Sequence, residues 1–497
     1  MNTEQIKLSK SEWQSIEIPL NSNEINIIKF IYNSFNDVNN NENNNNSFIN
    51  FLKLENNNSI MDYVFIKYFE DLIKNIYKLN KIKYNYKIKK DNKVLGKADI
   101  IRFSNLEKNI LKNKKIIFEY KIIHYIEQLV KHYIDVKKLV NNYYVIKNLL
   151  KNNIKNINIH LLNIINEILI YFKEDIEKKY IVYNIKQLTV GNIDLIKYQD
   201  MKLYNHQKQI FTEFKNQNYK LIFYIAPTGT GKTLTPIGLL NTKKIIFVCA
   251  VRHIGLALAK AAISIQKHVA FAFGCNDIED IRLHYFSAKE YIRDTKTGGI
   301  FKVDNSVGDK VELMICDIKS YEYAMHYMLS FNNKDDIILY WDEPTVTLDY
   351  NDHPCHNFIK NNWNKNVIPN IVLSSATLPD YKELDKTILY YKNKFDGDII
   401  TIKTFDYKKS ISIIDKYGYV VMPHNYTNEM NDIISSSNYL KKNKTLLRYL
   451  DIDECIEFIK KFNKISNDKR LTIENYFEDL DNITLESVKD YYLDCLS

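Results

Sequence analysis

The spacing of hydrophobic residues divides the chain into two parts that meet near residue 200. From about residue 110 to residue 181, apolar residues recur three and four positions apart without a helix breaker, as in IIHYIEQLVKHYIDVKKLV. This spacing is typical of amphipathic helices and predicts a mainly helical region. From Tyr219 onward, short apolar runs alternate with polar or helical stretches, which indicates strands buried on both faces of a parallel sheet. The predicted strands are LIFYI (221–225), KIIFVCA (244–250), VELMI (311–315), DIILYW (336–341) and NIVLSSA (370–376).

Two segments of the first 200 residues have a different pattern. Residues 39–58 hold two asparagine clusters around the apolar piece FINFLKLE, which predicts a loop or linker. KIKYNYKIKK (81–90) alternates polar and apolar residues, which predicts a strand with one basic face. We therefore expect a mainly helical region over 1–200 with an Asn-rich linker near 39–58, an α/β domain over 201–395, and a partial or reduced second α/β domain over 396–497.

With 497 residues, the chain is long enough for two or three domains. No run of 18 uninterrupted apolar residues occurs, and the first residues lack a basic stretch followed by an apolar core, so neither a membrane span nor a signal peptide is predicted. The six cysteines are scattered without a C-x-x-C pair, which indicates free thiols in a reducing compartment. We expect a cytoplasmic protein.

The net charge and the residue bias add two weaker expectations. A formal charge of +9 is compatible with a polyanionic partner. Lys, Asn, Ile and Tyr are abundant, with 37 Tyr, whereas Gly (12) and Pro (8) are scarce. Such a bias is expected when the coding DNA is rich in A and T, as in a giant virus, and a viral protein would act in the host cytoplasm or the virion.

The strongest chemical signal is APTGTGKT (226–233), which follows the predicted strand LIFYI. Gly229 and Gly231 allow the backbone to curl so that successive N–H groups point at phosphate oxygens. Lys232 would reach the β- and γ-phosphates of ATP, and the Thr233 hydroxyl would hold Mg²⁺. The alternative is a glycine turn without a ligand, which gives no packing reason for the Lys-Thr pair. The predicted ATP-binding residues are Ala226, Pro227, Thr228, Gly229, Thr230, Gly231, Lys232 and Thr233.

Two further polar groups close predicted buried strands. Asp342 and Glu343 follow DIILYW, where Asp342 would bind the metal through water and Glu343 would orient and deprotonate the attacking water. An acidic pair in this place is usually a solvated turn, but the upstream phosphate loop favours the catalytic interpretation. Ser375 and Thr377 belong to the cluster SSAT that closes NIVLSSA, and a helix cap before LPDYKEL is the alternative interpretation of that cluster.

Together these segments resemble the first motor domain of a superfamily 2 helicase of the DEAD/DEAH-box-like group. The resemblance covers roughly residues 200–390 and rests on A-x-x-G-x-G-K-T, D-E-x-x and S-A-T in that order. It implies a RecA-like fold with a parallel sheet, Mg-ATP hydrolysis by Lys232 and Glu343, and coupling of hydrolysis to movement through Ser375 and Thr377. It also implies that Gln207, in LYNHQKQIF, reads adenine.

The same resemblance implies two contacts to the backbone of RNA or DNA. Arg252 follows the predicted strand KIIFVCA, and Lys319 lies in CDIKSYEY. Contacts of this kind give affinity without sequence choice. A surface role for both side chains is the alternative.

The chain departs from the helicase pattern after Thr377. The family has a second motor domain whose motif Q-x-x-G-R-x-G-R supplies arginines to the transferred phosphate. Only Arg448 and Arg470 remain in the last 120 residues (497 minus 377), and neither lies in such a motif. TLLRYLDIDECIEFIKKF resembles only the start of a second domain. We therefore expect that this domain is incomplete, reduced or supplied by a partner chain, and that isolated ATPase activity is low.

The expected function is an ATP-dependent helicase or translocase acting on nucleic acid, with RNA slightly favoured over DNA. The alternative is a degenerate relative that binds nucleotide and nucleic acid without unwinding. A metabolic P-loop kinase is disfavoured, because Ser-Ala-Thr and Gln207 have no role there. Zinc binding by His353, Cys355 and His356 is also disfavoured, because no second ligand pair exists. The Lys-rich segment 74–97, with interleaved tyrosines, is better explained as a solvated face than as a strand-binding surface.

Overall fold

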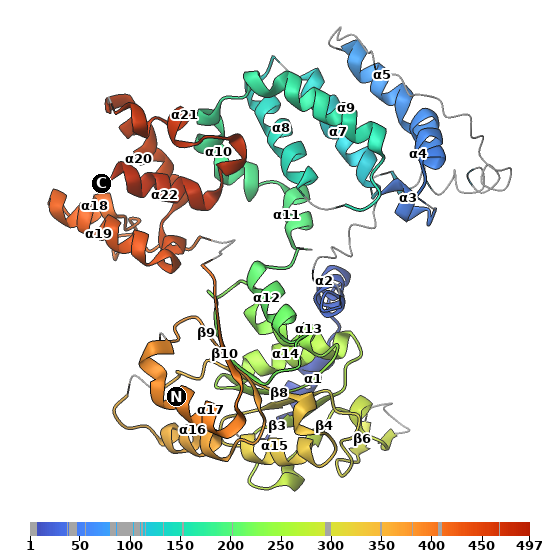
Figure 1. Ribbon diagram of the computed structural model, residues 1–497, viewed down its shortest axis with the longest axis vertical. Helices are drawn as coiled ribbons and strands as arrows, with labels where there is room; N and C mark the ends of the chain where they lie inside the picture. The colour runs from blue at the N-terminus through green and yellow to red at the C-terminus, as the bar shows by residue number, and fades with distance from the viewer. Residues whose placement is uncertain are drawn as a thin grey trace. The chain divides into compact units, whose positions relative to one another are not determined.

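The protein is described by a computed structural model that divides into two compact units (Figure 1). The α/β unit comprises Met1–Asn40 and Leu203–Lys409, and the helical unit comprises Asn41–Lys202 and Ser410–Ser497. The structure describes residues 7–36, 38, 47–54, 56–79, 86, 103, 110, 113, 114, 116–132, 134–151, 154–200, 202–293, 300–347, 350–379, 381–405, 410–466 and 468–497.

The α/β unit is built on an eight-stranded sheet of order β10-β1-β9-β8-β2-β7-β3-β4, in which only the β3–β4 pair is antiparallel. A separate antiparallel pair joins β5 to β6. The strands are β1 (Lys220–Ile225), β2 (Lys244–Cys249), β3 (Val269–Ala272), β4 (Arg282–Leu283), β5 (Tyr291–Arg293), β6 (Ile300–Val303), β7 (Leu313–Cys316), β8 (Ile337–Asp342), β9 (Asn370–Ser375) and β10 (Asp398–Lys403).

The five strands predicted from apolar runs are confirmed as β1, β2, β7, β8 and β9. Every residue of β1, β7, β8 and β9 is buried, as expected for parallel strands that are covered on both faces. The structure therefore confirms an α/β fold with a mainly parallel sheet.

Helices cover both faces of this sheet (Figure 1). On one face, Met325 of α15 and Tyr391 of α17 join the core that Phe223 and Trp341 form on the strands. On the other face, the hydroxyl of Tyr224 meets Thr235 of α13. The helices of this unit are α1 (Lys10–Glu17), α2 (Ser22–Asn33), α12 (Asn205–Glu213), α13 (Thr235–Leu239), α14 (Arg252–Ser264), α15 (Tyr321–Leu329), α16 (Pro354–Lys365) and α17 (Asp385–Phe395).

The first two helices belong to the α/β unit, which differs from the predicted helical region over 1–200. α1 packs on α14, and α2 packs on α13 and α14. Nζ of Lys267 lies 4.3 Å from the ring centroid of Tyr32 and donates to its hydroxyl at 2.9 Å. The division between the units falls inside the Asn-rich segment, at Asn40 and Asn41. A helical pattern shows which face of a helix is buried but not which unit buries it, so the sequence did not reveal this assignment.

The helical unit combines residues before and after the α/β unit. The amphipathic pattern over 110–181 is confirmed as helical. The helices are α3 (Phe48–Phe51), α4 (Asn58–Val64), α5 (Glu70–Leu79), α7 (Phe118–Lys131), α8 (Val136–Leu150), α9 (Ile159–Phe172), α10 (Lys178–Thr189), α11 (Ile193–Asp200), α18 (Pro423–Tyr426), α19 (Met430–Lys442), α20 (Ile452–Ile465), α21 (Ile473–Tyr476) and α22 (Leu485–Cys495).

The expected second α/β domain over 396–497 is wrong. β10 completes the main sheet beside β1, and no strand is assigned among the described residues that follow it. The segment TLLRYLDIDECIEFIKKF, which resembled the start of such a domain, forms the 3₁₀ helix η9 (Lys444–Tyr449) followed by α20. α20 and α22 bury their apolar faces against each other and against α10, so they extend the helical unit instead of forming a core of their own.

Polar contacts also join the C-terminal helices to the earlier part of the helical unit. Nζ of Lys178 donates to the backbone oxygens of Phe477 at 2.7 Å and Glu474 at 3.0 Å. Asp481 lies 2.9 Å from Nζ of Lys147 and 2.8 Å from Nζ of Lys151. The last 88 residues (497 minus 409) therefore complete a domain that begins near residue 41.

Two predictions lie outside the described residues. The strand KIKYNYKIKK (81–90) is described only at Tyr86, and most of the Lys-rich segment 74–97 is not described. In the part of the chain that is described, no helix is both long and apolar enough to cross a membrane.

Candidate functional site

Three predicted functional segments follow strands that are neighbours in the sheet. β1, β9 and β8 lie side by side in parallel, with Asp342 opposite Ser374. The carboxyl ends of parallel strands open at one edge, so the loops that follow them meet there. The backbone N–H of Ala226 donates to the oxygen of Ser375 at 3.3 Å, and that of Glu343 donates to the oxygen of Ser374 at 2.7 Å. The 226–233 loop, the acidic pair and the Ser-Ala-Thr segment are thus held together.

The backbone of the 226–233 loop passes twice through the left-handed region. Gly229 has φ +84° and Gly231 has φ +74°, which glycine adopts without steric cost. A Cβ at Gly229 would meet no atom within 4 Å, whereas a Cβ at Gly231 would lie 3.0 Å from Nε2 of Gln207. The hydroxyl of Thr230 donates to the oxygen of Pro227 at 2.7 Å and closes the turn. The loop is therefore compatible with the predicted phosphate cradle.

Gln207 braces this loop from α12. Its side chain is buried, its Nε2 donates to the oxygen of Gly231 at 3.2 Å, and its Oε1 accepts from the N–H of Tyr204 at 3.2 Å. Both ends of the amide are thus bonded within the protein. The contact with adenine stays a prediction.

Lys232 forms the central ion pair of the site. Its Nζ lies 2.5 Å from Oε1 of Glu343, and its side chain is only 6% exposed. The other carboxylate oxygen of Glu343 accepts from the hydroxyl of Ser375 at 2.5 Å. Hydrogen bonds that involve a charged donor or acceptor are stronger than those between neutral groups. One residue from each of the three segments therefore contributes to a single chain of contacts.

The backbone at Glu343 has a conformation that is uncommon for a residue with a side chain. Its φ is +51°, in the left-handed region. The N–H of Glu343 is meanwhile bonded to Ser374, so the strand end is fixed where the side chain bends toward Lys232. Such conformations persist only where the surrounding structure imposes them, and they cluster at functional sites.

Asp342 lies next to this ion pair at the end of β8. Burial raises the pKa of its carboxyl to about 6, the ammonium of Lys232 opposes that rise, and the carboxylate of Glu343 adds to it. The hydroxyl of Ser374 lies 3.4 Å from Oδ1 of Asp342 and gives weak support. A buried carboxylate with so little hydrogen bonding is suited to binding a cation.

Several polar side chains behind the site were not singled out in the sequence. The hydroxyl of Tyr340 on β8 lies 3.1 Å from the oxygen of Lys232 and 3.3 Å from Oγ of Ser374. The hydroxyl of Tyr224 on β1 contacts both Nδ1 of His206 and Oγ1 of Thr235. The available signal was a tyrosine inside each of the apolar runs LIFYI and DIILYW, because a buried hydroxyl needs a partner.

The helix that follows the loop is short. η4 (Lys232–Leu234) leads into α13, which has five residues and Pro236 in its first turn. A helix of this length contributes little dipole, so the ammonium of Lys232 is the main positive charge of the loop. Thr233 lies partly buried in η4, and the N–H of Thr377 donates to Oγ of Ser375 at 3.2 Å. Metal binding by Thr233 stays a prediction.

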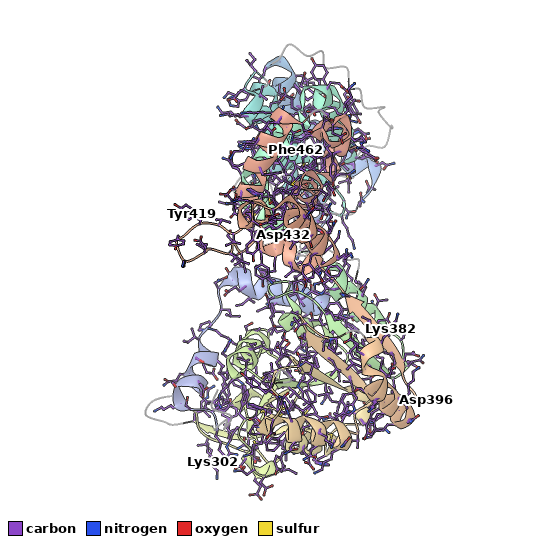
Figure 2. All side chains as sticks on the ribbon, turned by 90° about the vertical axis from the view of Figure 1, so that its left-hand side faces the viewer. Lys302, Lys382, Asp396, Tyr419, Asp432 and Phe462 are labelled. Carbon is purple, nitrogen blue, oxygen red and sulfur yellow. The ribbon has the colours of Figure 1, made fainter. Side chains whose placement is uncertain are left out.

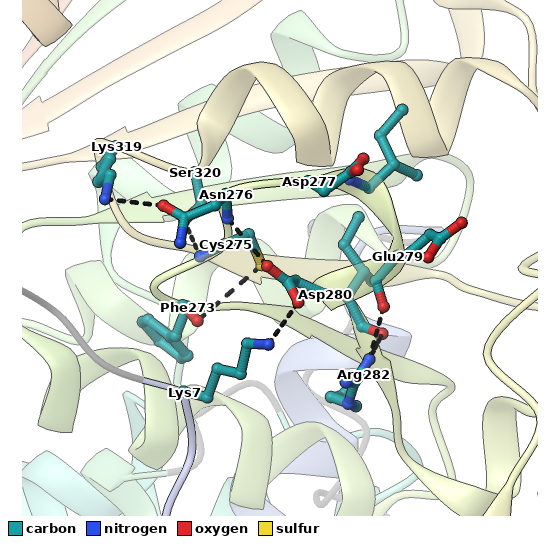
Figure 3. A network of polar contacts seen from close by, with 12 residues as sticks. Lys7, Phe273, Cys275, Asn276, Asp277, Glu279, Asp280, Arg282, Lys319 and Ser320 are labelled. Carbon is teal, nitrogen blue, oxygen red and sulfur yellow. Dashed lines mark hydrogen bonds and ion pairs between the residues drawn. The ribbon is translucent and has the colours of Figure 1, made fainter.

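The two predicted nucleic-acid contacts lie beyond this cluster. Arg252 begins α14, where its Nε lies 2.7 Å from Oε1 of Glu12 in α1 and its guanidinium lies 4.9 Å from the ring centroid of Phe273. Nζ of Lys319 donates to Oδ1 of Asn276 at 3.0 Å (Figure 3). Arg252 is therefore engaged by the N-terminal helix in this structure, and both nucleic-acid roles stay predictions.

The side chains of the His353 segment make local contacts. Nδ1 of His353 accepts from the N–H of Cys355 at 3.2 Å and caps α16, and Nε2 of His356 lies 2.8 Å from the oxygen of Thr347. Across the described ranges, no group of three or more His, Cys, Asp or Glu side chains is placed to hold a metal ion.

Comparison with known proteins adds no family assignment. No protein-family model matches the chain, and no curated protein sequence matches it.

Proposed function

We propose that the α/β unit is a RecA-like motor of the superfamily 2 helicase type, which binds Mg-ATP and hydrolyses it while bound to RNA or DNA. The observation that carries this proposal is the meeting of Lys232, Glu343 and Ser375 at one edge of the sheet. If the 226–233 loop were only a glycine turn and Glu343 only a solvated acid, the three loops, which are distant in sequence, would have no reason to share one chain of charge-assisted contacts.

Each residue of the cluster has a chemical task in this proposal. The ammonium of Lys232 binds the β- and γ-phosphates, together with N–H groups of the 226–233 loop. Glu343 accepts a proton from the attacking water. Ser375 holds the carboxylate of Glu343 in position and passes its movement to the Ser-Ala-Thr segment. Phosphate and Glu343 would compete for the three N–H donors of the Lys232 ammonium.

The residues present fit a Mg²⁺ ion. Thr233 and Asp342 would hold it, and its chemistry there is to neutralise charge on the phosphates. The supporting observation is the burial of the Asp342 carboxylate, which raises its pKa to about 6 and favours a cation beside it. A bound cation would stabilise the ionised form of Asp342.

A degenerate motor that binds ATP without hydrolysing it is the second candidate. The observation in its favour is that no strand is assigned among the described residues after 410, which leaves Arg448 and Arg470 in the helical unit. Arg470 is paired with Asp468 at 3.0 Å. An arginine finger is worth about 10³ to 10⁵ in rate, so its absence would give very slow turnover. A partner chain that supplies the second motor domain would restore it.

Nucleotide binding is tested first, with a fluorescent ATP analogue and the full chain. The unmodified protein should bind the analogue with Mg²⁺ present, and Lys232→Ala should weaken binding at least about tenfold, because one charged contact to phosphate is lost. Lys360→Ala, at an exposed position of α16, is the matched control. Equal affinity of Lys232→Ala and the unmodified protein would contradict the proposal.

A further inference from the structure

A groove of about 830 Å³ lies on the α/β unit between α1 and the segment that carries β4, β5 and β6. It is separate from the Lys232 cluster and shares no residue with it. One wall is α1, and the other consists of the short strand β4 and the β5–β6 pair beyond it. No role discussed above uses these side chains.

The groove has a strong excess of positive charge. Among the described residues that line it, four are basic and one, Glu17, carries a carboxylate, which contacts Nε2 of the buried His284 at 2.7 Å. Lys302 lies at the outer surface of the unit (Figure 2). The four basic residues are Lys10, Arg282, Arg293 and Lys302.

Aromatic rings lie among these cations. Trp13 of α1 and Tyr285 line the groove, and the ring of Tyr285 is 5.4 Å from that of Tyr291 on β5. The guanidinium of Arg293 lies 5.7 Å from the ring centroid of Tyr291. A groove that combines cations with rings offers both phosphate contacts and stacking faces.

Specific contacts hold α1 as the wall of the groove. The ring of Trp13 packs edge-on against Phe271 of β3 at 5.2 Å. Glu12 accepts from the N–H of Ser9 at 2.8 Å and pairs with Arg252, so one carboxylate both caps α1 and fixes it to α14. These contacts make α1 part of the α/β unit, with its one cation, Lys10, in the lining of the groove.

The turn before β4 is fixed in the same way (Figure 3). Lys7 pairs with Asp280, and the N–H of Asn276 donates to Oδ2 of Asp280 at 3.0 Å. Nη1 of Arg282 then donates to the backbone oxygens of Glu279 at 2.7 Å and Ile281 at 3.0 Å. The guanidinium of Arg282 is therefore oriented by the turn at the entrance of β4.

We infer that this groove binds a single strand of nucleic acid, with its cations on the phosphates and its rings against unpaired bases. The choice of nucleic acid as the occupant rests on the proposed function. The charge excess favours a polyanion, and the interleaved rings favour one with flat bases over an acidic peptide or polyphosphate. Binding here does not require ATP, because the groove shares no residue with the Lys232 cluster.

The test measures fluorescence anisotropy of labelled U12, dT12 and an abasic 12-mer with the full chain, without nucleotide, at several salt concentrations. Arg293→Glu combined with Lys302→Glu should weaken U12 or dT12 binding at least about tenfold. The slope of log affinity against log salt should become shallower by about 1.4, or about 0.7 for each cation. Lys360→Glu combined with Lys386→Glu, at exposed positions of α16 and α17, is the matched charge control and should change affinity about twofold at most.

A second pair of variants tests stacking. Tyr285→Ala should weaken binding of U12 or dT12 about tenfold and leave the abasic 12-mer unchanged, whereas Tyr285→Phe should bind as the unmodified protein does. Thermal unfolding of each variant checks that the fold is retained. Equal losses in the groove and control charge variants would overturn the inference, as would abasic binding as tight as that of U12 and dT12.

The ATP analogue assay on the same preparations separates this inference from the proposed function. If the unmodified protein binds the ATP analogue but the groove variants bind U12 and dT12 as tightly as it does, only the inference about the groove is overturned. If the unmodified protein does not bind the ATP analogue, the proposed function is overturned. The comparison of U12, dT12 and the abasic 12-mer then still decides what the groove binds.

Discussion

Nζ of Lys232 lies 2.5 Å from Oε1 of Glu343, which joins the loop after β1 to the acidic pair after β8. The ammonium is nearly buried, so it needs an anionic partner in every state of the protein. In this structure Glu343 supplies that anion. In the proposed function the phosphates of ATP replace it, which frees Glu343 to act on water.

Glu343→Gln should separate nucleotide binding from hydrolysis. The amide cannot take a proton from water, so the turnover rate should fall by about 10² to 10⁴, which is the usual contribution of a general base. The affinity for ATP should be retained or increased, because Lys232 no longer has a carboxylate that competes with phosphate. Phosphate release and binding of an ATP analogue, measured on the same protein, check both parts. A parallel loss of affinity and rate would instead show that Glu343 only maintains the shape of the loop.

Ser375→Ala and Ser374→Ala should have different effects although the residues are adjacent. Ser375 donates to Glu343 at 2.5 Å, so its loss should lower turnover about tenfold with little change in the Mg²⁺ requirement. Ser374 contacts Asp342 at 3.4 Å, so its loss should raise the Mg²⁺ concentration needed for half-maximal activity. Titration of turnover against Mg²⁺ distinguishes them. Identical profiles for the two variants would contradict the assigned roles.

Much of the candidate site was predictable because its signals are local. The runs LIFYI, DIILYW and NIVLSSA each end at a polar group, and buried parallel strands align such ends at one edge. The contacts of Lys232 with Glu343 follow from that alignment. The supporting Tyr340 was not predicted, since its role depends on which strand lies beside β8, and the order of strands is not written in the hydrophobic pattern.

The partners of the outer helices were not predictable in the same way. α1 and α22 both show one apolar face, but nothing local indicates that α1 packs on α14 or that α22 packs on α20. Chain order suggested that residues 1–200 form one region and that 396–497 form another. The structure divides them differently, because burial of an amphipathic face depends on the whole fold.

His206 should make the α/β unit less stable at acidic pH. Burial lowers the pKa of its imidazole to about 4, whereas the unfolded chain has a value of about 6.5. The unfolded state therefore binds a proton first, and stability is lost as the pH falls from about 6.5 toward 4. Between pH 7.5 and pH 5.0, the titration of His206 should lower the free energy of unfolding by about 2 kcal/mol.

Urea unfolding of the unmodified protein and His206→Gln at the two pH values measures that contribution. Glutamine does not titrate in this range. The variant loses the contact of His206 with Tyr224, which changes its free energy of unfolding by the same amount at both pH values. The free energy of unfolding of the unmodified protein should fall by about 2 kcal/mol more than that of the variant. An equal fall in both proteins would mean that His206 is not held in its neutral form.

Gly238→Ala tests the close packing of α13 on α12. A Cβ at Gly238 would lie 2.2 Å from Cζ of Phe211, so the ring or the helix has to move. The variant should lose about 1–3 kcal/mol of stability, as overpacked cores do. Phe211→Leu makes room for the methyl group, so the double variant should be more stable than the sum of the single effects predicts. Strict additivity, measured by urea unfolding, would show that the two positions do not touch.

The most direct test of the account is the rate of ATP hydrolysis by the full chain with and without single-stranded RNA and DNA. The unmodified protein should hydrolyse Mg-ATP, slowly if a second motor domain comes from a partner, and nucleic acid should raise the rate. Lys232→Ala, with an unchanged thermal unfolding profile, should fall to the background rate. Hydrolysis by Lys232→Ala as fast as that of the unmodified protein, with nucleic acid present, would contradict the claim that the 226–233 loop is the site of ATP hydrolysis.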